Sequence, residues 1–236
     1  MMRANRMYSP TQNEFEKLAA QGNLIPVTRR ILADFETPLS AYRKIRGQGE
    51  SFLFESVEGG EYIGRYSFVG CNPRAVIRQT GNCVEVIENG KVVESFAVAG
   101  RTGVAPVSEL NNGDRRDACP TVADGLEVVE RVMKKFHAVA TPGLPRFTGG
   151  AIGFIGYEFI HDVEPVVPRP PQDELKTPVM YFLIADQLLT FDRAQQTITI
   201  LVNAILEDAE SPADAYENAT EEIDRILSLL EQPSEH

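Results

Sequence analysis

The sequence predicts an α+β fold in which a largely antiparallel sheet carries helices on one face. Short β-branched and aromatic runs divided by glycines fill residues 51 to 98, which is typical of strands. Apolar residues recur at helical spacing over 121 to 136 and over 211 to 230, which is typical of amphipathic helices. Hydrophobic residues make up 43% of the 236-residue chain, so a substantial core can form.

Two segments near the N-terminus carry helix start signals. Ser9-Pro10-Thr11-Gln12 combines a capping residue, a proline at the first helical position and a glutamine, which predicts a short helix to about Ala20. Thr37-Pro38-Leu39-Ser40 repeats the pattern and predicts a second helix that ends at Gly47. The residues expected to face the core from this second helix are Leu39, Tyr42 and Ile45.

The first strands are expected between residues 51 and 98. Asn89-Gly90 lies between two β-branched runs and predicts a hairpin, because both turn positions tolerate a positive φ. Residues 100 to 120 are polar and rich in Gly, Asn, Asp and Arg, which predicts a mobile surface excursion. An amphipathic helix is then expected over 121 to 136, with Leu126, Val129, Val132, Met133 and Phe136 on its apolar side.

The remaining elements are expected to complete the sheet. Residues 147 to 157 have strand character, and 163 to 178 carry five prolines, which predicts an extended connection. Two buried strands are expected over 179 to 191 and 197 to 202, followed by a helix that Ser211-Pro212 caps. The apolar stripe of this last helix consists of Tyr216, Ala219, Ile223, Ile226, Leu227 and Leu230.

Charge and cysteine content exclude several classes of function. The net charge of −11 opposes binding to nucleic acid and to anionic membranes. Cys71, Cys83 and Cys119 are odd in number and lack Cys-x-x-Cys spacing, which argues against a disulfide framework and against a zinc site. The longest apolar run, 179 to 191, is interrupted by Asp186 and is too short to span a membrane. We expect a cytoplasmic protein without a metal site.

The best candidate for a binding site is the end of the strand at Phe54-Glu55-Ser56. Glu55 can pair with an ammonium group, Ser56 can hydrogen-bond either end of an amino acid, and Arg65 can face a carboxylate across the Gly59-Gly60 turn. These groups suit a small zwitterion, and neighbouring phenylalanines offer apolar walls for an aromatic side chain. The alternative is that Glu55 and Ser56 are simply two solvated residues at a strand end.

Several blocks of the sequence resemble the large subunit of anthranilate synthase. Phe54-Glu55-Ser56 is similar to its Leu-Glu-Ser element, and 64 to 70, Gly-Arg-Tyr-Ser-Phe-Val-Gly, is similar to the segment that follows. Further blocks at 147 to 157 and 178 to 183 agree with it. The resemblance runs from about Val27 to about Asn203, so it covers most of the chain.

The resemblance implies that residues 1 to 236 are the N-terminal, regulatory domain of this subunit. Its implied role is to bind tryptophan as a feedback inhibitor through Glu55 and Ser56, with Arg65 and Ser67 as further matches to the motif. It also implies that the sheet is half of the sandwich shared by anthranilate and aminodeoxychorismate synthases. An apolar surface exposed on this half is expected to favour a homodimer.

The catalytic residues are implied to lie elsewhere. In the family, chorismate and Mg²⁺ are bound by a C-terminal catalytic domain, which this chain does not include, and a glutamine amidotransferase subunit supplies nitrogen. We therefore expect the chain alone to be inactive, with no catalytic residue of its own. Two alternatives stay open: the N-terminal domain of aminodeoxychorismate synthase component I, which usually carries an Asp-Ser-Ala element instead, and a stand-alone sensor of amino acids without catalysis.

Overall fold

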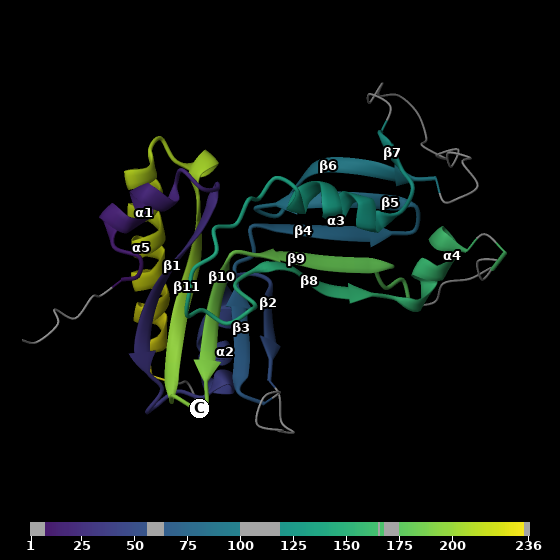
Figure 1. Cartoon of the computed structure of the whole chain (residues 1–236). Helices are drawn as coiled ribbons and strands as arrows, with labels where there is room; N and C mark the ends of the chain where they lie inside the picture. Colours follow the sequence, from purple (N-terminus) through teal and green to yellow (C-terminus); the bar gives the residue numbers. More distant parts are fainter. Residues whose placement is uncertain (1–7, 56–63, 100–118, 165, 168–174, 234–236) are drawn as a thin grey trace, which may run out of the picture. The chain divides into compact units, whose positions relative to one another are not determined.

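The computed structural model describes residues 8–55, 64–99, 119–164, 166–167 and 175–233. Figure 1 shows its helices and strands along the chain. The chain forms two compact units, the first from residues 1–73, 136–150 and 185–236 and the second from 74–135 and 151–184. Each unit contains a sheet with helices, which confirms the α+β class, although there are two sheets where the sequence predicts one.

The sheet of the first unit has five strands in the order β1-β11-β10-β3-β2, and all neighbours pair antiparallel. Its strands are β1 (Leu24–Leu32), β2 (Ser51–Phe54), β3 (Tyr66–Cys71), β10 (Gln187–Asp192) and β11 (Thr197–Ile205). Strand β1 is not predicted from the sequence, because no helix or hairpin signal lies in residues 24 to 32. Pro26 is tolerated within it because β1 is an edge strand of the sheet, and its outer side is paired only by single bridges at Thr28 and Leu24.

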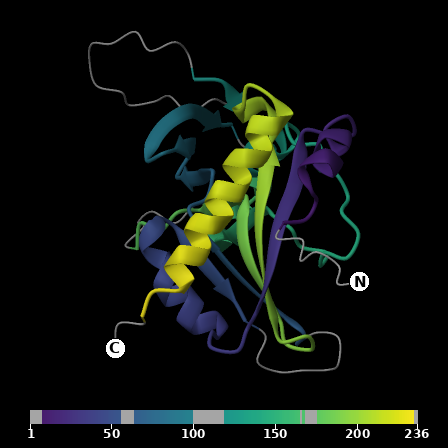
Figure 2. The ribbon, with the colours of Figure 1, turned by 90° about the vertical axis from the view of Figure 1, so that its left-hand side faces the viewer.

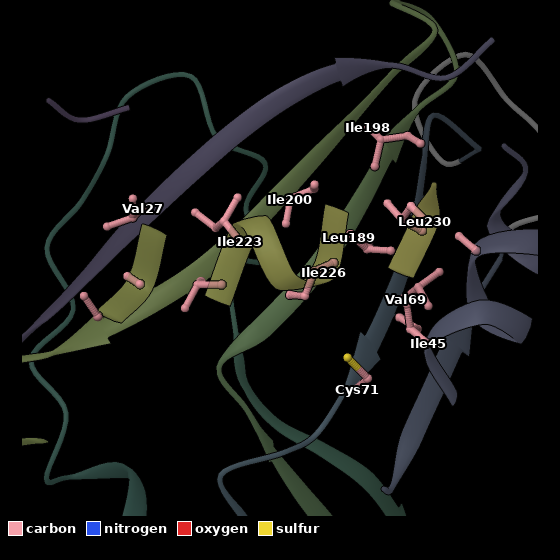
Figure 3. Close-up of a cluster of buried hydrophobic side chains, with 14 of the residues drawn as sticks. Val27, Ile45, Val69, Cys71, Leu189, Ile198, Ile200, Ile223, Ile226 and Leu230 are labelled. Atoms are coloured by element: carbon pink, nitrogen blue, oxygen red, sulfur yellow. The ribbon is translucent and has the colours of Figure 1, made fainter. Parts of the chain in front are cut away.

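Helices cover one face of this sheet. They are α1 (Gln12–Leu18), α2 (Pro38–Ile45) and α5 (Pro212–Leu230), with the short 3₁₀ turns η1 (Arg46–Gln48) and η3 (Leu206–Asp208) beside them. Figure 2 shows α5 lying along β11. Alternate residues of the strands meet the apolar side of α5, and Figure 3 shows Ile223 and Ile226 of the helix among Val27, Leu189 and Ile200 of the sheet.

The sheet of the second unit has six strands in the order β7-β6-β5-β4-β9-β8. They are β4 (Ala75–Thr80), β5 (Cys83–Glu88), β6 (Lys91–Val98), β7 (Thr121–Val122), β8 (Gly150–Ile155) and β9 (Met180–Ala185). The β6–β7 pair is parallel, whereas β4, β5, β6 and β9 pair antiparallel. Helix α3 (Gly125–Met133) packs against β4 and β7, and η2 (Tyr157–Phe159) and α4 (Ile160–Val163) follow β8.

Most helix predictions are confirmed, with corrections at their ends. The cap of α1 is Thr11, whose backbone N–H donates to Glu14, so the helix starts two residues later than Ser9 suggests. Thr37 caps α2 as predicted, but Leu39 is 55% exposed and Ala41 is buried in its place. Helix α3 is shorter than predicted, because residues 121 and 122 pair with β6.

The apolar run at 179 to 191 is not one strand. It forms β9 in the sheet of the second unit and β10 in the sheet of the first unit, with Asp186 between them. Both strands are largely buried, so hydrophobicity does not mark the change of sheet. Within the described ranges, none of the helices meets the length and hydropathy that a membrane crossing requires.

Candidate functional site

Two strand ends and a turn of the first unit meet at the predicted site. Glu55 directly follows β2, and Arg65 directly precedes β3. Asp192 ends β10 and lies opposite Tyr66 in the antiparallel register, so the β10–β11 turn lies beside Arg65. Arg193 is the first residue of this turn, and its backbone N–H donates to the carbonyl oxygen of Arg65 at 3.0 Å.

Arg65 is engaged with Asp192 rather than facing an open site. Its Nε and Nη2 donate to the two carboxylate oxygens of Asp192 at 3.0 and 2.7 Å. The same carboxylate accepts the backbone N–H groups of Ala194 and Gln195 at 3.0 and 3.2 Å. The hydrogen bonds from Arg65 lower the pKa of Asp192, and this effect outweighs the burial that would raise it. This network fixes the turn to the start of β3.

The lowered pKa of Asp192 predicts a contribution to stability that depends on pH. Because the folded pKa lies below the ordinary value of 3.8, the contribution is complete above that value and is lost as the pH falls through the folded pKa. Asp192→Asn should therefore cost about 1 kcal/mol near neutral pH and less in acid. Urea unfolding between about pH 7 and pH 3 measures this, with the exposed Asp34→Asn as control. Parallel pH curves for wild type and Asp192→Asn would contradict the assignment.

Glu55 lies at the same corner of the sheet, which is formed by Glu55, Arg65, Asp192 and Arg193. It pairs with Arg193, the arginine of the β10–β11 turn. Arg193 Nη2 donates to Glu55 Oε1 at 2.8 Å, and the two side chains remain 44% and 32% exposed, respectively. The strands predicted over 179 to 191 and 197 to 202 imply a connection at this place, but the sequence contains no signal that brings Arg193 to Glu55. Only the order of the strands does so, because β10 pairs with β3 and β3 pairs with β2.

Ser67 and Ser56 have different positions relative to this corner. Ser67 lies in β3 opposite Phe191 and is fully buried, and its hydroxyl oxygen has no hydrogen-bond partner among the described residues. It shares the face of the sheet that the helices cover, because Val69, two residues on, belongs to that core. Ser56 and the Gly59-Gly60 turn lie outside the described residues.

The expected apolar walls lie on the opposite face of the same sheet. Phe54 pairs with Phe68 across β2 and β3, and Phe68 makes an edge-to-face contact with Phe147 at 5.2 Å between centroids. Phe52 lies 5.4 Å from Phe54 between ring centroids, and the Phe54 side chain is half exposed. Aromatic surface is therefore present next to Glu55 in the sequence and is accessible at Phe54.

The described residues contain no group of three or more His, Cys, Asp or Glu side chains that is arranged to hold a metal ion. The acidic and basic side chains of the corner are paired with one another instead. Two ion pairs, Arg65–Asp192 and Arg193–Glu55, thus join the ends of β2, β3 and β10.

The chain is similar to several curated proteins over most of its length. It is 34% identical over 227 residues to "Anthranilate synthase component 1" of Neisseria meningitidis serogroup B, covering 94% of this chain and 40% of that protein. It is 35% identical over 231 residues to the protein of the same name from Synechocystis sp., covering 96% and 40%. The protein of that name from Acetivibrio thermocellus is 34% identical over 197 residues, covering 84% and 35%.

These relatives are longer than the chain, which spans about two fifths of their length. A crystal structure of anthranilate synthase component I from Streptococcus pneumoniae matches with a TM-score of 0.49 and 22% identity, covering 86% of this chain and 37% of that one. No family model matches the chain.

Proposed function

Because the chain belongs to the anthranilate synthase component 1 family, of whose members it spans about two fifths, we propose that it is the tryptophan-binding regulatory part of such an enzyme. The reaction proposed for the whole protein converts chorismate and ammonia, or nitrogen from glutamine, to anthranilate and pyruvate in tryptophan biosynthesis. The names of the relatives favour this reading over aminodeoxychorismate synthase.

The observation that carries the proposal is the carboxylate of Glu55 at the end of β2, next to the half-exposed Phe54. An amino acid with an indole side chain needs a carboxylate for its ammonium group and apolar surface for its ring. Glu55 supplies the first and the aromatic residues around Phe54 supply part of the second. Ser56 is proposed as a further direct contact, and Arg65 and Ser67 are proposed to support the strand ends that present the site.

Feedback inhibition is proposed to be allosteric. Tryptophan would favour one of two states of the whole protein, and the strength of inhibition would equal the difference in its affinity for the two states. We propose that Mg²⁺ and the catalytic residues belong to the part of the family sequence outside this chain, which spans about two fifths of its relatives. The chain alone would then be inactive.

The name component 1 suggests a second component, and we propose a glutamine amidotransferase subunit as that partner. We also propose a cytoplasmic location, because of the cysteine content and the charge of the sequence. A homodimer of the isolated chain is proposed because the sheet is expected to expose an apolar surface. A stand-alone amino-acid sensor uses the same binding site and differs only in lacking the catalytic part. Calorimetry on the isolated chain measures the binding that both proposals require.

Replacing Glu55 by glutamine tests the site. The change keeps the size of the side chain and removes the charge, so the ammonium group of tryptophan loses a charge-assisted hydrogen bond. We expect tryptophan to bind this variant of the 236-residue chain at least about tenfold more weakly by isothermal titration calorimetry. Glu16→Gln, on the exposed side of α1, is the matched control and should bind like wild type.

In the complete enzyme, Glu55→Ala and Ser56→Ala should abolish inhibition by tryptophan and leave turnover unchanged. Loss of turnover and of inhibition to the same degree would refute a purely regulatory role. Equal affinity of wild type and Glu55→Gln for tryptophan would refute the site itself.

A further inference from the structure

The two arginines of the corner differ in how fully they are engaged. Arg65 uses two nitrogens on Asp192, and one oxygen of that carboxylate also accepts two backbone N–H groups. The Asp192 side chain is only 11% exposed, so its carboxylate is largely closed to a ligand, although the Arg65 side chain is 37% exposed. Arg193, by contrast, meets Glu55 through one terminal nitrogen and one carboxylate oxygen among the described residues.

The Glu55–Arg193 pair has the capacity to receive a zwitterion. A guanidinium carries five N–H donors and a carboxylate carries two acceptor oxygens, so a single contact leaves donors on Arg193 and an oxygen on Glu55 that can bind further groups. The ammonium and carboxylate of an α-amino acid are attached to the same carbon. They therefore require an acidic and a basic side chain that lie side by side, and Arg193 Nη2 lies 2.8 Å from Glu55 Oε1.

We infer that Arg193, rather than Arg65, receives the α-carboxylate of an amino acid whose ammonium group binds Glu55. This inference rests on the proposed function and assigns a residue that the sequence motif does not contain. Arg65 is then a positioning residue. Its guanidinium holds Asp192 and its carbonyl oxygen accepts the N–H of Arg193, so it fixes the turn from which Arg193 reaches Glu55.

Exposure distinguishes the two ion pairs through their carboxylates rather than through their arginines, since Asp192 is 11% exposed whereas Arg65 is 37% exposed. The Arg193 and Glu55 side chains are 44% and 32% exposed, so a ligand can reach both. An exposed ion pair contributes little to stability on its own, so removing Arg193 leaves the fold intact. The loss of binding in an Arg193 variant can then be attributed to the ligand contact.

Comparison of tryptophan with tryptamine, which lacks the carboxylate, tests the inference. We expect Arg193→Gln to weaken the binding of tryptophan about tenfold and to leave that of tryptamine unchanged, by calorimetry on the 236-residue chain. Arg193→Lys keeps the charge and should retain part of the preference for tryptophan. Arg30→Gln is the matched control, because Arg30 contacts Gln195 of the same turn and should leave both ligands unaffected.

Arg65→Gln supplies a second readout. A positioning role predicts that this variant also loses preference for tryptophan over tryptamine while its affinity for tryptamine is kept. If Arg193→Gln weakens the binding of tryptophan and of tryptamine equally, Arg193 only orients Glu55. If this variant binds tryptophan as tightly as wild type does, Arg193 has no role in binding. Either result overturns the inference and leaves the proposed function standing. A wild-type chain that binds neither ligand overturns both.

Discussion

Replacing Ile223 by alanine is expected to lower the free energy of unfolding by about 3 to 4 kcal/mol. Ile223 is fully buried in the middle of α5 and points into the core between the helix and the sheet (Figure 3). The substitution removes three carbon atoms from a packed interior, so the protein loses both the burial of apolar surface and the contacts around the resulting cavity.

Urea unfolding followed by circular dichroism measures this change. Glu221→Ala, two residues away on the exposed side of the same helix, changes the helix by a similar loss of side chain without opening a cavity. Its effect should stay within about 0.5 kcal/mol of wild type. Equal destabilisation by the two variants would mean that α5 does not pack on the sheet through Ile223.

Gly153→Ala is expected to destabilise the second unit by about 3 kcal/mol through a steric clash. A Cβ atom at Gly153 of β8 would lie 1.8 Å from the carbonyl oxygen of Tyr181 and 2.8 Å from the Cα of Phe182. Both atoms belong to the backbone of β9, so no side-chain rotation relieves the contact. The strands must separate, and the hydrogen bonds near the end of β8 should weaken with them.

Hydrogen exchange of the Gly156 amide reports this separation, because its N–H donates to the carbonyl oxygen of Val179 at 2.7 Å. We expect faster exchange of this amide in Gly153→Ala, together with the loss of stability. Gly47→Ala serves as the control, since no atom lies within 4 Å of a Cβ at that position. Unchanged exchange at Gly156 would refute the close approach of β8 to β9.

The elements that local sequence predicts correctly depend on residues close together in the chain. Asn89 and Gly90 have φ angles of 50° and 72° in the turn between β5 and β6, as the hairpin signal requires. Thr37 and Ser211 cap α2 and α5 because a hydroxyl accepts an N–H only a few residues on. Such contacts form in the same way whatever the rest of the chain does.

Errors arise where the partner of a segment lies far along the chain. The run from 179 to 191 is largely apolar on both sides of Asp186, and burial is equally satisfied in one sheet or in two, so hydrophobicity does not reveal that β9 and β10 separate. The exposed position of Leu39 has a similar origin. Helical spacing places it on the apolar side of α2, but the core meets the helix through Ala41 and Ile45.

The α+β class, the caps of α2 and α5, the hairpin and the acidic residue that closes β2 could all be predicted from the sequence, because each depends on neighbours within a few positions. Tertiary structure decided which charges meet at the candidate site. Arg193 reaches Glu55 across 138 positions, and Asp192 reaches Arg65 across 127. These pairs follow from the order of the strands in the sheet. That order is set by the packing of the whole first unit, so it cannot be recognised from the short segments that contain these residues.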